Sequence, residues 1–202
     1  MKTFLVLVVV LAMSACTNSG QAPSPVELKH FPLDSLEGVR ATSGVSFDPK
    51  VSTDGKGSLR VDANQAMTVP LFEVTEVSIE NATLLYQASL QTQSLDGKAF
   101  LEMWVRIPGK GEFFSRGLDR PVTGTMSWMT AVTPFFLEAG QKPDLIRLNL
   151  VVQGRGRVWI DDVHLKVLPF PGHWSKANPR LDSRRGVTQL VPKPMVSAQF
   201  LR

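Results

Sequence analysis

The sequence of 202 residues contains a single cysteine, Cys16. One cysteine cannot form an intrachain disulfide, and it cannot assemble a zinc site built from several thiolates. Only three histidines are present, His30, His164 and His173, which leaves little material for a histidine-rich metal site or a catalytic dyad. The sequence also lacks a Gly-x-Ser-x-Gly elbow, a His-Glu-x-x-His helix and a phosphate-binding glycine loop. We therefore expect a protein that is not an enzyme.

Positive charge is scarce in the body of the chain, although the formal net charge is +4. Residues 17–168 hold 15 basic and 17 acidic side chains, whereas residues 169–202 hold six basic and one acidic. Because the excess of positive charge lies in the C-terminal tail, the body offers no basic surface for nucleic acid, and we expect no nucleic-acid partner. The tail, residues 169–202, is predicted to be either a solvated terminus or a contact for anionic envelope polymers or lipid headgroups.

The one long hydrophobic run lies at the N-terminus, where Lys2 precedes nine apolar residues, 4–12. This is the length of the apolar region of a signal peptide and is too short to span a bilayer as a helix. Residues 13–16 read Met-Ser-Ala-Cys, which resembles the bacterial lipobox. The resemblance implies a signal peptide of residues 1–15, cleavage before Cys16 and diacylation of its sulfur. The alternative is an ordinary secretory signal with a coincidental cysteine.

An acylated Cys16 predicts anchoring to membrane lipid. Two or three acyl chains hold a protein durably at a membrane, where a single chain gives marginal binding. Thr17 stands next to the cysteine in place of Asp, which resembles the outer-membrane sorting pattern of Gram-negative bacteria. Residues 16–29 are mostly small and polar and include proline, which predicts a tether. We therefore expect a lipid-anchored protein of the bacterial cell envelope, on the outer membrane if the host is Gram-negative.

Residues 30–168 show an apolar period of two and almost no helical spacing. In residues 84–91, for example, Tyr86, Ala88 and Leu90 alternate with polar side chains. Turn signals rich in glycine occur at residues 54–57, 96–97, 108–111 and 154–156. This pattern predicts one all-β domain, an antiparallel β-sandwich of the jelly-roll type. The other strand-like segments are residues 44–47, 58–62, 67–72, 99–107, 127–136, 146–152 and 157–167.

Two segments resemble a known family. Residues 54–61, Asp-Gly-Lys-Gly-Ser-Leu-Arg-Val, and residues 154–165, Gly-Arg-Gly-Arg-Val-Trp-Ile-Asp-Asp-Val-His-Leu, resemble the early loop-strand and the final strand of galactose-binding-like jelly rolls. More narrowly, they are similar to the carbohydrate-binding modules appended to bacterial glycanases. The resemblance covers about residues 31–168. It implies a non-catalytic module, and many modules of this family carry a structural calcium ion.

Asp161 gives an independent reason to expect calcium. Strand alternation places it on the same side as Trp159, Val163 and Leu165, which are predicted to face the core. An isolated buried charge is very costly, so a carboxylate there must be paired or bound to a metal. Calcium takes six to eight oxygen ligands. The alternative is that Asp161 caps backbone amides at a bulge. The predicted calcium ligands are Asp34, Asp54 and Asp161.

A candidate ligand face follows from the alternation in residues 99–107. If Leu101, Met103, Val105 and Ile107 form the core side, the indole of Trp104 lies on the polar side. An indole flanked by amide and charged groups suits a sugar, whose C–H face packs on the ring while its hydroxyls form hydrogen bonds. The predicted ligand-binding residues are Trp104, Glu102, Arg106, Gln87, Arg147 and Asn149.

Two structural alternatives apply to Trp104. Residues 109–118 are predicted to form a loop that could cover the indole, because Phe113 and Phe114 need burial. Alternatively, Arg106 forms a cation–π contact with Trp104 that only stabilises the sheet. Two further tryptophans, Trp128 and Trp159, are predicted to lie in the core.

These features together predict an exported, lipid-anchored, non-catalytic protein that binds carbohydrate or another envelope component through its jelly-roll domain. The alternative is a structural or assembly lipoprotein that contacts a protein partner and binds no sugar.

Overall fold

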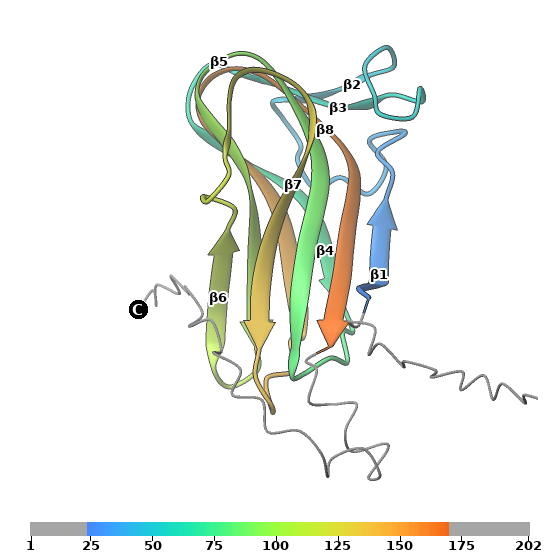
Figure 1. The fold of residues 1–202 in the computed structure, drawn as a ribbon, viewed down its shortest axis with the longest axis vertical. Helices are drawn as coiled ribbons and strands as arrows, with labels where there is room; N and C mark the ends of the chain where they lie inside the picture. Colours follow the sequence, from blue (N-terminus) through green and yellow to red (C-terminus); the bar gives the residue numbers. More distant parts are fainter. Residues whose placement is uncertain (1–23, 170–202) are drawn as a thin grey trace, which may run out of the picture.

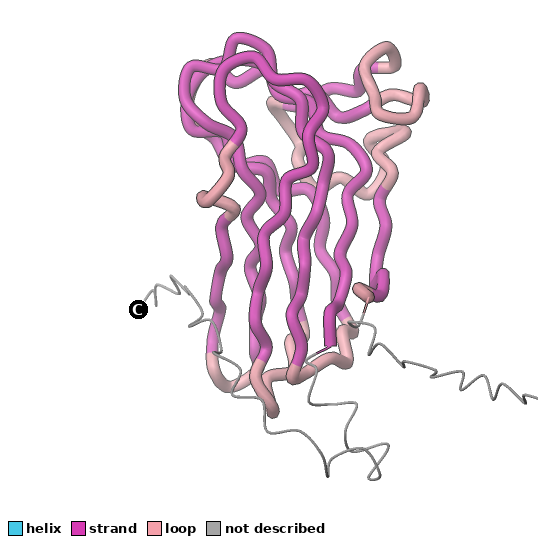
Figure 2. The backbone as a smooth tube through the Cα atoms, viewed as in Figure 1, coloured by secondary structure: helices cyan, strands magenta, loops and turns pink. Residues whose placement is uncertain are grey.

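The computed structural model describes residues 24–169, and within them the chain forms strands and connecting segments only (Figures 1 and 2). No helix long and apolar enough to cross a membrane occurs in this range. The eight strands are β1 Val26–Phe31, β2 Val45–Asp48, β3 Ser58–Ala63, β4 Met67–Thr75, β5 Ala82–Ile107, β6 Gly111–Arg116, β7 Val122–Leu137 and β8 Leu145–Pro169.

The two longest strands, β5 and β8, form the centre of the fold. They pair antiparallel from Ala82 opposite Pro169 to Arg106 opposite Leu145, and both arch over at one end of the molecule (Figure 1). Layer A contains residues 82–93 of β5 and 157–169 of β8. In this layer β7 lies next to β5, β1 and β3 lie next to β8, and β2 lies next to β3. Layer B contains residues 98–107 of β5 and 145–153 of β8, flanked by β6 and β4.

The connection between the layers depends on a pair of glycines. Gly97 of β5 and Gly154 of β8 are direct cross-strand partners, with φ angles of 126° and 139°. A Cβ on Gly97 would overlap the carbonyl oxygen of Gln153, and one on Gly154 would overlap that of Asp96. The turns predicted at residues 96–97 and 154–156 are therefore wrong. Because these glycines have no side chain, the two backbones stay paired through the bend instead of ending in turns.

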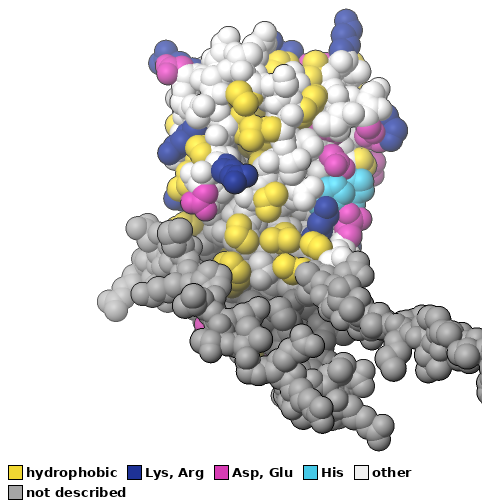
Figure 3. Space-filling view, viewed as in Figure 1, with side chains coloured by type: hydrophobic (Ala, Val, Ile, Leu, Met, Phe, Trp, Pro, Cys, Tyr) yellow, Lys and Arg dark blue, Asp and Glu magenta, His cyan; other side chains and the backbone are white. Residues whose placement is uncertain are grey.

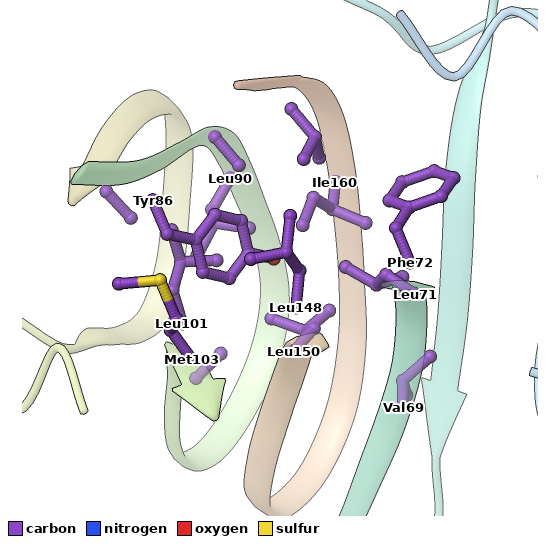
Figure 4. Packing of buried hydrophobic residues seen from close by; sticks show 14 of the residues in the cluster. Val69, Leu71, Phe72, Tyr86, Leu90, Leu101, Met103, Leu148, Leu150 and Ile160 are labelled. Carbon is purple, nitrogen blue, oxygen red and sulfur yellow. The ribbon is translucent and has the colours of Figure 1, made fainter. Parts of the chain in front are cut away.

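The core lies between the two layers (Figure 4). Leu101, Met103, Val105 and Ile107 are all buried, which confirms the side of β5 that was predicted to be dry. Each fully buried side chain of this size stabilises the fold by about 1.5–3 kcal/mol relative to exposure to water. Residues from β4, β5 and β8 pack together there; Leu148 and Leu150 of β8 lie between Tyr86 of β5 and Leu71 of β4.

A β-bulge in β8 changes which residues face the core. Ser89 pairs with Asp161 and Gln87 with His164, so two residues of β8 oppose Ala88, and the first of them, Asp162, has φ of 53°. A bulge shifts the inside–outside alternation by one residue. Val158 and Ile160 face the core before the bulge, whereas Val163 and Leu165 do so after it.

The prediction that Trp159 and Asp161 share the core face with Val163 and Leu165 is therefore wrong. Both are buried, but neither belongs to the core cluster. The indole nitrogen of Trp159 donates to Asp48 Oδ2 at 3.0 Å, at the end of β2. This hydrogen bond is the main reason that the pKa of Asp48 lies below its usual value. Trp128 is also outside the core cluster, and its side chain is only half-buried.

Two strands were missed by the sequence pattern, β1 and β6. β1 begins at Val26, inside the segment 16–29 that was predicted to be a tether. It is an edge strand of which only Leu28 and Phe31 pack against the core, so its alternation is weak. β6 lies within residues 109–118, which were predicted to be a loop.

The hydroxyl of Tyr86 generates a stability prediction. The side chain is fully buried, and its oxygen makes no hydrogen bond to the described residues; burial also raises the pKa of this phenol. An unpartnered buried hydroxyl destabilises a fold. We expect Tyr86→Phe to raise the free energy of unfolding in urea by about 1 kcal/mol. A loss of stability in Tyr86→Phe would show that the hydroxyl has a partner and would contradict this description of the core.

Candidate functional site

The outer surface of layer B carries Trp104 at its centre. Trp104 lies in β5 between two cross-strand partners, Phe114 of β6 and Arg147 of β8. Its indole is half-buried, and it points away from the core, as predicted. We call this surface the Trp104 face, and its members are Trp104, Glu102, Arg106, Phe114, Arg116, Arg147 and Asn149.

The orientation of the indole is fixed by Glu102. The carboxylate is 4% exposed, and its Oε1 accepts hydrogen bonds from Trp104 Nε1 at 2.7 Å and from Asn149 Nδ2 at 3.2 Å. Its Oε2 accepts one from Arg116 Nε at 2.6 Å. Such charge-assisted bonds are about twice as strong as neutral ones, and together they occupy both oxygens. Glu102 and Asn149 are buried, so they hold Trp104 in place rather than offering their own groups to a ligand.

The aromatic surface is larger than the sequence indicated. The ring of Phe114 lies 5.1 Å from that of Trp104 at an angle of 43°, and the guanidinium of Arg116 lies 4.6 Å above Phe114. Phe113, the neighbouring residue of β6, packs against the core instead. Residues 109–118 therefore lie beside Trp104 as a strand and do not cover it as a loop. Phe113 and Phe114 are adjacent, so in a strand they face opposite sides. This was the available signal in the sequence, but two residues are too few to identify a strand.

The cation nearest the Trp104 ring is Arg147, not Arg106. The guanidinium of Arg147 lies 6.0 Å from the indole centroid and also forms an ion pair with Glu112 at 2.5 Å. Arg106 instead donates to Asp144 Oδ1 at 2.8 Å. This hydrogen bond lowers the pKa of Asp144 below its usual value.

Gln87 does not belong to this group. It lies in layer A, where its strand partners are His164 and Val132, and its amide oxygen is 3.4 Å from Lys166 Nζ. The bend in β5 separates it from Trp104. Its predicted place beside Trp104 is therefore wrong, because the prediction treated the two halves of β5 as neighbours in one flat sheet.

Asp161 is satisfied by the protein itself. Its side chain is 1% exposed, and Oδ2 accepts hydrogen bonds from the backbone N–H of Thr53 at 2.7 Å and from Thr53 Oγ1 at 2.6 Å. Oδ1 accepts one from the backbone N–H of Asp162 at 3.0 Å, at the bulge. This arrangement corresponds to the alternative interpretation of Asp161 as a residue that caps backbone amides.

The other two predicted calcium ligands converge on a lysine. Lys56 Nζ lies 2.9 Å from Asp54 Oδ2 and 3.5 Å from Asp34 Oδ2. A hydrogen bond from Lys56 lowers the pKa of Asp54, and the bond to Asp54 in turn raises the pKa of Lys56. One oxygen, Asp34 Oδ1, is buried without a hydrogen bond to the described residues.

These residues do not fit a calcium ion. Between residues 24 and 169, one group of three side chains brings its ligand atoms within 4.8 Å of one another, and it contains neither Asp34, Asp54 nor Asp161. Calcium needs six to eight oxygens at one point, whereas here the Lys56 ammonium group and four N–H or O–H donors occupy most of the carboxylate oxygens. The one unpartnered oxygen, Asp34 Oδ1, supplies a single ligand where calcium needs at least six.

Comparisons with known proteins identify the fold. No family model and no curated protein match the sequence. Among solved structures, the xylan-binding domain CBM22-1 of Paenibacillus barcinonensis Xyn10C has a TM-score of 0.52 at 15% identity, over 75% of this chain and 99% of that one. The CBM22-1 and GH10 modules of Clostridium thermocellum Xyn10B, solved with xylohexaose, give 0.54 at 10% identity, over 71% of this chain and 28% of that one. Similarity at these identities shows the fold alone, and it confirms the predicted antiparallel β-sandwich of the jelly-roll type.

Removing the Asp161 carboxylate tests its structural role. We expect Asp161→Ala to lower the free energy of unfolding by about 2 kcal/mol, because it leaves the donors of Thr53 and Asp162 without their acceptor. Asp54→Ala is the matched control, since the Asp54 side chain is exposed and pairs with Lys56 near the surface. Equal losses in the two variants, measured by urea denaturation, would contradict the assignment.

Because Asp34, Asp54 and Asp161 do not fit a calcium ion, a second prediction concerns calcium binding. After treatment with EDTA and dialysis, we expect added calcium chloride to leave the melting temperature unchanged, because Lys56 and Thr53 already occupy the carboxylates. A rise in melting temperature on adding calcium, abolished in Asp161→Ala, would show that a calcium site forms.

Proposed function

We propose that this protein is an exported, lipid-anchored and non-catalytic binding protein that takes up carbohydrate on its Trp104 face. The observation that carries this proposal is the half-exposed indole of Trp104, whose orientation is fixed by the buried Glu102 carboxylate at 2.7 Å. An exposed aromatic ring in a fixed orientation loses little entropy when a ligand packs on it, which favours binding.

The chemistry of the face suits a neutral sugar. The rings of Trp104 and Phe114 offer adjoining apolar surfaces for the C–H faces of pyranose units. Arg106 lies two residues after Trp104 in β5, and Arg147 of β8 is the cross-strand partner of Trp104; both arginines carry N–H groups that can donate to hydroxyls. Both are already paired with carboxylates, Asp144 and Glu112, so the face carries little excess charge to attract an anionic polymer.

The same ion pairs support a role without catalysis. Hydrolysis of a glycosidic bond generally requires two carboxyl groups free to act as acid and as base or nucleophile. The carboxylates on and beside the Trp104 face are each bound to one of its arginines: Glu102 to Arg116, Glu112 to Arg147 and Asp144 to Arg106. Similarity of the fold to a xylan-binding domain is consistent with a polysaccharide ligand and supports the proposal at that level.

The anchor is proposed from the sequence. Residues 1–15, Cys16 and nearly all of the C-terminal tail, residues 170–202, lie outside the described residues. In this proposal, acylated Cys16 holds the protein at a membrane of the bacterial cell envelope, and the sandwich holds a glycan close to that membrane. Palmitate labelling that is lost in Cys16→Ser would support the anchor.

A structural or assembly role is the second candidate, because layer A exposes apolar side chains. Val132 and Phe136 of β7 are 45% and 42% exposed, and hydrophobic side chains gather on one face of the molecule (Figure 3). Among the described strands β7 pairs with β5 alone, so it offers a protein partner apolar surface and those backbone groups of its other edge that β6 does not contact.

Binding to polysaccharides separates the two candidates. We expect the protein to bind at least one neutral polysaccharide in affinity electrophoresis, and Trp104→Ala to weaken this binding about tenfold or more, since the stacking surface is lost. Trp128→Ala is the matched control, because Trp128 is half-buried in β7, away from the Trp104 face. An array of neutral glycans that shows no binding, or equal binding by the wild type and Trp104→Ala, would contradict the proposal.

A further inference from the structure

Two of the three histidines in the sequence meet on the outer surface of layer A. His30 of β1 and His164 of β8 are direct cross-strand partners. Their rings stack with centroids 4.2 Å apart and an interplanar angle of 1°. Figure 3 shows the two imidazoles side by side at the surface, with acidic side chains on either side of them.

Carboxylate oxygens face three of the four ring nitrogens. Asp162 Oδ1 lies 2.7 Å from His30 Nε2 and 3.0 Å from His164 Nε2, and Glu27 Oε2 lies 2.6 Å from His164 Nδ1. The positive φ of Asp162 at the bulge turns this residue toward the histidines. We call Glu27, His30, Asp162 and His164 the histidine cluster.

The cluster has fewer N–H donors than it needs if its rings are neutral. A neutral imidazole carries one N–H, whereas His164 turns both ring nitrogens toward carboxylate oxygens. A divalent cation bound to the rings uses nitrogen lone pairs as ligands and brings positive charge next to the carboxylates.

The distances are within reach of metal coordination. One ligand atom each from Glu27, His30 and His164 lies within 4.8 Å of the other two. Around a tetrahedral zinc ion with bonds of about 2.0–2.1 Å, neighbouring ligand atoms lie about 3.3 Å apart. Stacked parallel rings direct their lone pairs into separate planes, so His30 must leave the stack to share an ion with His164. The side chains of His30 and Glu27 are 39% and 47% exposed and can turn toward the ion, whereas His164, at 13%, is held in place.

We propose that the histidine cluster binds a divalent transition-metal ion of the zinc class. Two imidazole nitrogens and the Glu27 carboxylate form a donor set that suits zinc, nickel or copper, and Asp162 accepts from the nitrogen of a ligating ring that does not bind the ion. Calcium and magnesium prefer oxygen ligands throughout, so this site discriminates against them.

The ion would connect the first strand of the domain, β1, to the last strand, β8. Within residues 24–169, β1 pairs with β8 alone, and the cluster takes Glu27 and His30 from β1 and Asp162 and His164 from β8. Metal binding would therefore hold β1 against β8 and stabilise the fold. The site lies in layer A, whereas the Trp104 face lies in layer B, so the inference goes beyond the proposed function and does not depend on it.

Zinc titration tests the inference. The full chain, without a histidine tag and kept in detergent, is prepared with Cys16→Ser and His173→Ala so that no other thiol or imidazole competes. We expect calorimetry to show one zinc ion per chain and zinc to raise the melting temperature. In the same background, His30→Phe keeps a ring in the stack but removes a ligand, and we expect it to weaken zinc binding about tenfold or more. Glu27→Gln is expected to weaken it as well.

Two controls make the outcome decisive. Glu112→Gln removes a carboxylate of layer B and is expected to leave zinc affinity unchanged, and calcium at the same concentration is expected not to raise the melting temperature. If His30→Phe folds, as its circular dichroism would show, and still binds zinc with the affinity of its parent, the inference is wrong. Absence of any zinc binding by the parent would overturn it equally.

Discussion

The backbones of β5 and β8 meet at Gly97 and Gly154 more closely than any side chain permits. This contact allows one antiparallel ladder to pass from layer A to layer B without a turn. Because the ladder continues, Glu102 lies opposite Asn149 and Trp104 opposite Arg147 in layer B, while Gln87 lies opposite His164 in layer A. The register through the glycine pair therefore sets which residues of β8 lie opposite Glu102 and Trp104 in layer B.

The bulge at Asp162 has a second, more local effect. One additional residue in β8 turns Asp161 under the segment that carries Thr53 and turns Asp162 toward the two histidines. Burial raises the pKa of Asp162, but hydrogen bonds from His30 and His164 outweigh this and leave it below its usual value. At this bulge, the Asp161 carboxylate binds Thr53 in the loop after β2, and the Asp162 carboxylate joins the histidine cluster.

Local periodicity was enough to predict the fold class and the dry side of β5, because alternation between neighbours depends only on the strand itself. Leu101, Met103, Val105 and Ile107 are buried for this reason. Periodicity could not predict that the ladder runs through Gly97 and Gly154, because glycine with positive φ looks the same in a turn and in a bent ladder. The exclusion of Gln87 from the Trp104 face follows from that bend.

The misplacement of Trp159 and Asp161 has a related cause. In a regular strand, every second residue faces the same side, so the prediction assigned residues 157–167 to alternate sides throughout. Nothing in this segment marks the bulge at Asp162, after which the sides are exchanged. The partners of Glu102, Glu112 and Asp34 are Arg116, Arg147 and Lys56, which lie in other segments of the chain and meet these carboxylates only in the folded protein. The role of a carboxylate as structural anchor, metal ligand or ligand contact is decided by such partners.

The glycine pair can be tested by comparing Gly154→Ala with Gly109→Ala. Both glycines have positive φ, but a Cβ on Gly109 would meet no atom within 4 Å, whereas one on Gly154 would overlap the backbone of Asp96. The measured quantity is the free energy of unfolding in urea. For Gly109→Ala the account predicts a loss of about 1–2 kcal/mol from backbone conformation alone. For Gly154→Ala it predicts a loss at least about 2 kcal/mol larger, because two backbones must separate. Equal losses would contradict a continuous β5–β8 ladder.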